Sequence, residues 1–349
     1  MSEMKEFIMD STEKILRDLS TKEIRESFEE GHEAIELWKT CEEAGLTLLG
    51  ISEEQGGVGG DFEDVLGVLY LAGRYAAPIP LLEIIIANSL LASNGMEFGD
   101  KKRVVQFISE EEGNLIEKVP FARYVEELVL IKKDGEQSAI TFLDLSTIKL
   151  QAGRNLAAEP RDTVEIDDSV NWVKLAVDYE ILKDKHLIKT AAGKGAQMTG
   201  AIEAVLNLSV FYSKERKQFG RPLHKFQAIQ HHLTAMAGEY AAAYSTLQVT
   251  AGAFEKPYFT DYVAMMKTEL SSRANTVAKA AHQLHAGIGM TYEHELHHFT
   301  RRLWSWREEA GNETYWTSRL ADLYMQDDYE IWEQITFVKE DEVHAGSII

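Results

Sequence analysis

The sequence contains a single cysteine, Cys41, and only six prolines among its 349 residues. One cysteine cannot form a disulfide within the chain, which is typical of a reducing compartment, so we expect a cytoplasmic location. Scarce proline favours long helices, because proline is the strongest helix breaker. No apolar run approaches the ~20 residues that a membrane-spanning helix requires, so the sequence predicts no membrane segment.

Positive charge is also scarce, with 36 Lys and Arg against 57 Asp and Glu and a net charge of −21. This balance argues against nucleic acid and anionic membranes as partners. The exception is the stretch KERKQFGRPLHKFQAIQHH at 214–232, where five of the first twelve residues are basic. Phe219 lies inside it, and Gly220 and Pro222 predict a turn. Guanidinium groups, amides and a ring suit a nucleotide or pyrophosphate, although a solvated basic turn between two helices is the simpler alternative.

The residue patterns predict a mainly α fold in three parts. Residues 1–103 form an N-terminal helical domain, in which Asp61 follows a glycine-rich turn and caps a helix that continues to Arg74. Residues 104–180 form a small middle β domain, with β-type runs at 104–108, 128–132, 139–145 and 163–166. Residues 181–349 form a C-terminal four-helix bundle, with helices at 187–214, 226–254, 260–285 and 314–335.

The sequence His294–His298 reads HELHH and formally matches HExxH. On a helix, histidines four residues apart face the same way and could bind zinc, with the glutamate as a base. No third ligand follows at a suitable spacing, and many aromatic residues lie nearby. We therefore predict that these histidines are structural and that the chain has no metal site.

A second loop that could approach a ligand follows the predicted helix 260–285. Gln283 lies at the end of this helix, and Gly287 and Gly289 leave the backbone of the next turn bare. In a bundle of alternating up and down helices, this loop and the basic stretch at 214–225 lie at the same end. The sequence therefore predicts two loops that could bind one nucleotide.

Two stretches, YSKERKQFGRPLHKFQAIQHHLTAMA and HQLHAGIGMTYEHELHHFTRR, resemble the signature segments of the acyl-CoA dehydrogenase family. The stretch EEQGGVGGDFEDVLGVLYLAGRYAAPIPLLE is similar to its N-terminal segment, especially in the branch with bacterial sterol side-chain dehydrogenases. The resemblance implies the same three-part architecture, FAD, and α,β-desaturation of an acyl-CoA thioester. It also implies a homo- or hetero-oligomer, a dimer or tetramer, that passes electrons to an electron-transferring flavoprotein.

The resemblance further implies that the basic turn and the glycine turn reach across a dimer interface. There they hold the adenine and pyrophosphate end of FAD that is bound mainly by the neighbouring subunit. Carried over position by position, the implied contacts from the basic arm are Arg216, Gln218, Phe219, Leu223 and Gln227. Those from the second loop are Gln283, Leu284 and Gly287.

The sequence departs from the family in the middle domain. The TE…GSD strand and loop and the W-(I/S)-(T/S) strand, which normally hold the flavin ring, are not found between Val104 and Ala176. The β region also looks shortened by a few tens of residues. The part of the site that binds the flavin ring is therefore predicted to be missing from this chain.

The catalytic base is the second departure. The family places a glutamate before a glycine, but alignment on Gly311 puts Ala310 at that position. The family's other base position falls near Lys189 or Thr190, where there is no carboxylate. Glu309 is one residue away and is the candidate base, although one residue on a helix is a rotation of about 100°. An exposed carboxylate at a helix end is the simpler alternative.

Three hypotheses remain open at this point. The chain could be an FAD-dependent acyl-CoA dehydrogenase that works alone, with Glu309 or another, unrecognised carboxylate as base. It could be a partner subunit without a base, which completes the FAD site of a companion chain that carries the glutamate. It could also be a flavin-free structural homologue.

Overall fold

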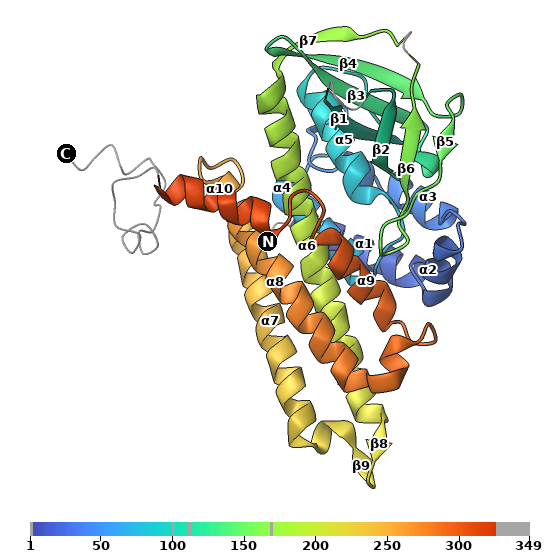
Figure 1. Cartoon of the computed structure of the whole chain (residues 1–349), viewed down its shortest axis with the longest axis vertical. Helices are drawn as coiled ribbons and strands as arrows, with labels where there is room; N and C mark the ends of the chain where they lie inside the picture. The colour runs from blue at the N-terminus through green and yellow to red at the C-terminus, as the bar shows by residue number, and fades with distance from the viewer. Residues whose placement is uncertain (1–2, 100, 110–112, 168–169, 326–349) are drawn as a thin grey trace, which may run out of the picture.

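The computed structural model describes residues 3–99, 101–109, 113–167 and 170–325 (Figure 1). Its N-terminal part is helical, with α1 (Glu3–Leu19), α2 (Lys22–Glu29), α3 (Ile35–Glu43), α4 (Phe62–Arg74) and α5 (Leu81–Ser93). The predicted cap of α4 is confirmed. The Asp61 carboxylate accepts a hydrogen bond from the Asp64 backbone N–H, and the Asp64 carboxylate accepts one from the Asp61 N–H. This reciprocal pair satisfies two of the amides that a helix start leaves free.

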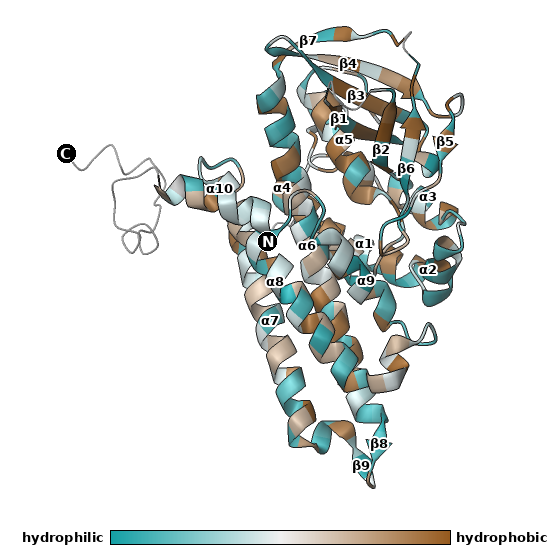
Figure 2. Ribbon diagram, viewed as in Figure 1, coloured by the Kyte–Doolittle hydropathy of each residue, from teal (hydrophilic) through white to brown (hydrophobic). Residues whose placement is uncertain are grey.

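The middle part forms two sheets. One has the order β1-β3-β4-β7, and the other has the order β2-β6-β5. The four predicted β-type runs are confirmed as β1 (Arg103–Ile108), β3 (Glu127–Asp134), β4 (Gln137–Asp144) and β6 (Arg161–Glu165), although the last two strands end one residue before the predicted runs do. The hydropathy colouring shows that β1 and β3 are among the most apolar strands (Figure 2). Helix α5 packs against β1 of this sheet.

The prediction missed β2 (Leu115–Pro120), β5 (Leu150–Gln151) and β7 (Val173–Asp178). In β2 the pairing with β6 shifts between Ile116 and Val119, and Lys118 has a φ of 58°. The two buried side chains therefore lie three residues apart, and the alternation that signals a strand is lost. Strand β7 is an edge strand with mostly exposed residues, so it lacks an apolar run.

The C-terminal part consists of α6 (Tyr179–Glu215), α7 (Gln227–Gly252), α8 (Phe259–His285), α9 (Leu296–Trp306) and α10 (Glu313–Met325). The long helices α6, α7 and α8 pack against one another, α9 packs on α6, and α10 packs on α8. The predicted helix 314–335 corresponds to α10 as far as Met325, and its remainder lies outside the described residues. The helix α9 was missed, although Leu296, Phe299 and Leu303 place apolar side chains at helical spacing.

Small residues on α6 allow α4 to cross it closely. A Cβ atom on Gly200 would lie 1.9 Å from the Tyr70 carbonyl oxygen, and one on Gly73 would lie 1.9 Å from the Gln197 carbonyl oxygen. Only glycine fits at either position, because a Cβ atom cannot occupy that space. This crossing joins the N-terminal helices to the bundle. The mainly helical class with a middle β part is thereby confirmed.

Candidate cofactor arm and reaction cavity

The basic stretch forms a hairpin at the lower end of the bundle (Figure 1). After α6, strand β8 (Lys217–Gln218) pairs with β9 (Arg221–Pro222), and a short 3-10 turn, η5 (Leu223–Lys225), leads into α7. The two turn residues, Phe219 and Gly220, have φ angles of 50° and 77°. Two consecutive positive φ values are typical of the tight turns that close two-residue hairpins.

The arm offers its polar groups to the solvent. Arg216, Gln218 and Gln227 are exposed, and no side-chain hydrogen bond to them is found in the part of the chain that the structure describes. The Phe219 ring is 93% exposed, while Leu223 is half-buried. An exposed guanidinium, two amides and a bare aromatic ring fit an anionic dinucleotide such as FAD.

The second predicted loop lies at the same end. Helix α8 ends at His285 and continues into η6 (Ala286–Met290). The His285 ring stacks on Tyr212 near the end of α6, with ring centroids 4.6 Å apart, so the sequence correctly placed the two loops together. Gln283 and Gly287 are exposed, and a Cβ atom on Gly287 would meet nothing within 4 Å. The Leu284 side chain is buried in the core, so its backbone is the group left for a ligand.

A cavity of about 830 Å³ lies between the middle β part, α5, α6 and α9. Its lining includes Thr190, Glu309 and Ala310, which are the residues at or beside both base positions of the family. Residues distant in the sequence thus meet in one cavity. We call this space the reaction cavity. It is also lined by Glu83, Gln106, Phe107, Lys118, Asn155, Arg161, Lys183, His186, Lys194 and Trp304.

Glu309 is half-buried in this cavity and is held by two cations, so it is not the exposed carboxylate of the simpler alternative. The Arg161 Nη2 donates to both carboxylate oxygens at 2.7 Å, and the Lys194 Nζ lies 3.2 Å from Oε2. Asn155 donates a further hydrogen bond of 2.9 Å. Burial raises the pKa of Glu309, but Arg161 and Lys194 outweigh it and lower the pKa to about 2.

The ion pairs limit what Glu309 can do chemically. A general base works best when its pKa lies near the working pH, because it must then be both ionised and basic. A carboxylate with a pKa of about 2 is ionised at neutral pH but is a weak proton acceptor. In the observed arrangement Glu309 anchors the middle β part, through Arg161, to the bundle, through Lys194.

Lys267 of α8 binds the backbone of the loop that carries Glu309. Its fully buried Nζ donates to the carbonyl oxygens of Trp306 at 3.0 Å and Glu309 at 2.9 Å. These carbonyls belong to the end of α9, where a cation is favourable. Burial lowers the pKa of Lys267 to about 7. The position of Glu309 is therefore fixed by its backbone as well as by its side chain.

Sequence reasoning did not find Arg161, Lys194 or Asn155. For Lys194 a signal was present, because it is a lone lysine among small residues in AAGKGAQ, a segment that is buried throughout. A buried lysine needs a carboxylate, and Lys194 also pairs with Glu83 at 3.2 Å. Nothing in the sequence near Arg161 singled it out.

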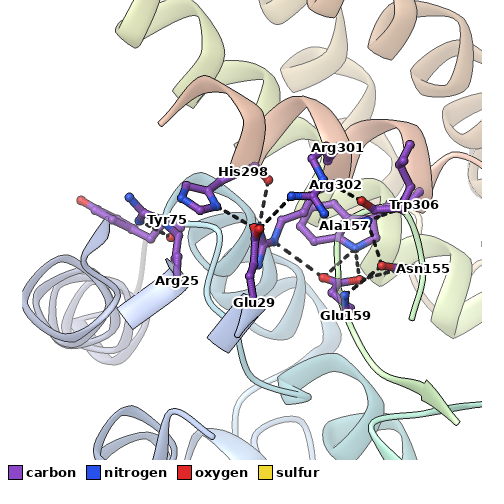
Figure 3. A network of polar contacts seen from close by, with 12 residues as sticks. Arg25, Glu29, Tyr75, Asn155, Ala157, Glu159, His298, Arg301, Arg302 and Trp306 are labelled. Atoms are coloured by element: carbon purple, nitrogen blue, oxygen red, sulfur yellow. Dashed lines mark hydrogen bonds and ion pairs between the residues drawn. The ribbon is translucent and has the colours of Figure 1, made fainter. Parts of the chain in front are cut away.

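The HELHH segment takes part in an ion-pair network. His294 precedes α9, and Glu295 pairs with Arg25 of α2. The His298 Nδ1 lies 2.8 Å from the Glu29 carboxylate, which also pairs with Arg301 at 2.7 Å (Figure 3). Burial outweighs these contacts and lowers the pKa of His298 to about 4.

Glu29, His297 and His298 do place three possible ligand atoms within 4.8 Å of one another. However, Arg25, Arg301 and Arg302 also belong to this network, and Arg302 lies beside Glu159 and Trp306 (Figure 3). Guanidinium groups so close to the cluster oppose a divalent cation. The network joins α2 to α9, and the absence of a metal site stays a prediction.

Comparison with known families gives two matches. Residues 2–108 match the model of the acyl-CoA dehydrogenase N-terminal domain, and residues 185–322 match that of the acyl-CoA dehydrogenase C-terminal domain. The residues between these segments include most of the middle β part. Over the described residues, no helix has the length and apolar character needed to cross a membrane.

Among curated proteins, acyl-CoA dehydrogenase IpdE2 of Mycolicibacterium smegmatis is 30% identical over 277 residues, which cover 76% of this chain and 80% of IpdE2. Two solved structures share the fold. The Tcur3481-Tcur3483 steroid ACAD G363A variant has a TM-score of 0.82 at 20% identity, covering 93% of this chain and 98% of that one. The ChsE4-ChsE5 complex from Mycobacterium tuberculosis has a TM-score of 0.83 at 16% identity, covering 94% and 99%.

Proposed function

Because the chain belongs to the acyl-CoA dehydrogenase family, we propose that it is a subunit of a hetero-oligomeric, FAD-dependent acyl-CoA dehydrogenase whose companion chain supplies the base. The observation that carries this proposal is the state of Glu309. Both cations in contact with it hold it as a weakly basic carboxylate, and Ala310 occupies the family's base position.

Desaturation of an acyl-CoA thioester requires removal of an α-proton by a carboxylate within reach of that carbon. When bound, FAD supplies the acceptor for the hydride that leaves the β-carbon. In this proposal the base belongs to the companion chain. The present chain contributes the arm, in which Arg216 binds the pyrophosphate and Phe219 covers an apolar part of the nucleotide. Gln283 and the bare backbone at Gly287 add a second contact.

The surface of α7 supports association with another chain. This helix has 26 residues, of which Glu239 is the one Lys, Arg, Asp or Glu, and Tyr244 and Val249 are exposed on it. A long uncharged surface is unusual in a protein with a net charge of −21 and is typical of subunit interfaces. The fold neighbours are also consistent with a companion, because one is named as the ChsE4-ChsE5 complex and the other as Tcur3481-Tcur3483.

A second candidate function is a dehydrogenase that works alone with Glu309 as base. It is favoured by one observation, the position of Glu309 in the wall of the reaction cavity. It requires substrate binding to displace Arg161 and so raise the basicity of Glu309. In both candidates the substrate is an acyl-CoA, and the electron acceptor expected from the family is an electron-transferring flavoprotein.

The test is to express the chain alone and together with acyl-CoA dehydrogenase homologues encoded near it. The proposal expects colourless protein alone, and yellow, active protein only in the complex. One FAD per chain that bleaches with acyl-CoA in the isolated chain would refute it and favour the second candidate. If no companion restores flavin, the chain is a flavin-free structural homologue.

The arm can be tested within the complex by the substitution Arg216→Ala. A charge-assisted contact to pyrophosphate contributes about 1.5–3 kcal/mol. The Kd for FAD should therefore rise roughly ten- to a hundredfold in this variant. The matched control is Arg17→Ala, which removes an arginine that is exposed on α1. Equal FAD retention by both variants would contradict the assignment of the arm.

A further inference from the structure

A second cavity, of about 580 Å³, lies between α5, the first turns of α6 and the turn that joins α7 to α8. It is of the size that small-molecule sites have in proteins. Its lining shares only Ile86 and His186 with the reaction cavity. It is also far in the fold from the hairpin arm, which lies at the opposite end of α6. The proposed function therefore leaves this cavity without a role.

The two cavities face different sides of α6. Lys183, Leu187, Thr190 and Lys194 recur at spacings of three and four and line the reaction cavity. Leu182, Lys185 and Lys189 recur in the same way and line the second cavity. Residues at this spacing share a helix face, whereas neighbours such as Lys189 and Thr190 are about 100° apart. Lys189 therefore lines the second cavity and not the reaction cavity. It also lines a smaller adjoining pocket of about 140 Å³, together with Phe62 and Ser89.

The lining of the second cavity is apolar with cations at one side. Its apolar part includes Leu90, Ile188, Phe254 and Phe259, and its charged part includes Lys185, Lys189 and Lys256. Glu255 is the acidic residue of the lining and is exposed. An apolar space with several cations and one solvated carboxylate is suited to an apolar ligand that carries a negative charge.

Two contacts hold the Lys189 ammonium group. Its Nζ donates to the Ser89 hydroxyl at 3.1 Å and lies 5.9 Å from the centroid of the Phe62 ring. No carboxylate forms an ion pair with it among the residues for which the structure gives side chains. Burial and the neighbouring Lys185 lower the pKa of Lys189. A partly buried ammonium without a counter-ion is costly, and an anionic ligand would remove that cost.

We propose that the second cavity binds a small apolar carboxylate, with Lys189 contacting the carboxylate and the apolar residues of α5 and α6 surrounding the hydrocarbon. This site lies on a different face of α6 from the reaction cavity, with which it shares Ile86 and His186, and it is far from the FAD arm. It needs neither flavin nor the companion chain, so its test and the test of the proposed function can fail independently.

The experiment measures binding of octanoate and of 1-octanol to the isolated full-length chain by calorimetry. The two probes have the same hydrocarbon length and differ in charge. A charge-assisted contact predicts that octanoate binds at least about tenfold more tightly. Lys189→Met should abolish this preference and leave 1-octanol binding unchanged. The control Lys279→Met removes an exposed lysine of α8 and should keep the preference.

A third variant tests the location. Thr260 lines the second cavity but not the reaction cavity, so Thr260→Trp should prevent binding of both probes in a folded protein, as judged by circular dichroism. Equal affinities for the two probes, no binding of octanoate, or an unchanged preference in Lys189→Met would overturn the proposal. Binding by the isolated chain that disappears in the complex would show that a subunit covers the cavity, and would overturn it as well.

Discussion

The role of Glu309 as an ion-pair anchor can be tested by the substitution Glu309→Gln, which keeps the shape of the side chain and removes its charge. The pKa of this group falls from 4.5 to about 2 in the folded chain. At about 1.4 kcal/mol for each pKa unit, the charged form contributes roughly 3 kcal/mol to the free energy of unfolding. Breaking one side of a buried ion pair gives a similar figure, about 3–5 kcal/mol.

The sign of the pH dependence follows from the lowered pKa. The contribution of Glu309 is fully present above the unfolded pKa of 4.5 and is lost as the pH falls toward about 2. Glutamine does not titrate. The difference in unfolding free energy between the native chain and Glu309→Gln should therefore be constant above about pH 5 and shrink below it.

The assay is urea denaturation at neutral pH and at several acidic values. The control is Glu308→Gln, because Glu308 is the adjacent residue and is exposed, with an ion pair to Arg307. We expect the control to change the unfolding free energy by less than about 0.5 kcal/mol. If Glu309→Gln changes the unfolding free energy at neutral pH as little as the control does, the anchor interpretation is refuted. The second candidate function, with Glu309 as the base, is then favoured.

Three further predictions concern stability. Gly200→Ala should lower the unfolding free energy by about 3 kcal/mol or more, because the added Cβ atom would overlap a backbone carbonyl. The control Gly238→Ala, on the exposed side of α7, should be neutral or slightly stabilising. The midpoints of urea denaturation distinguish the two variants. The pKa of Lys267 is about 7 in the folded chain and 10.5 in the unfolded chain, so the unfolding free energy of the native protein should rise between these two pH values. Lys267→Met should remove this rise, and a variant with the same pH profile as the native protein would contradict the prediction. Asp61→Ala should lower the unfolding free energy, measured by thermal unfolding, by about 1 kcal/mol, because it breaks the reciprocal cap with Asp64. A change near zero would contradict this prediction.

The parts of the fold that depend on neighbouring residues in the chain were predictable. The cap at Asp61, the four regular strands and the three long helices all have local signals, and these elements were confirmed. Strand β2 was missed because its bulge breaks the alternation of apolar residues. Helix α9 was missed although its apolar residues have helical spacing, because the HExxH match overlaps its first turn. A local pattern supports prediction only where no irregularity or competing motif interrupts it.

The candidate site was predictable only in part, for a different reason. The arm and the glycine turn are local segments, and the bundle topology correctly placed them at one end. The environment of Glu309 depends on Arg161, which is 148 residues away in the sequence, and on Lys194 from another helix. No single sequence shows which distant cation reaches a given carboxylate. The basicity of Glu309 therefore became clear only from the fold.

The hairpin at the tip of the bundle has a consequence for how two chains would meet. Its conformation is set by its own pairing and by the positive φ angles of Phe219 and Gly220. Ordering a free loop costs about 1–2 kcal/mol for each residue, and here that cost has been met during folding. Binding of a nucleotide would then reduce the conformational freedom of little more than the side chains of Arg216 and Gln218. Such preorganisation favours tight binding by a short segment that has few contacts of its own.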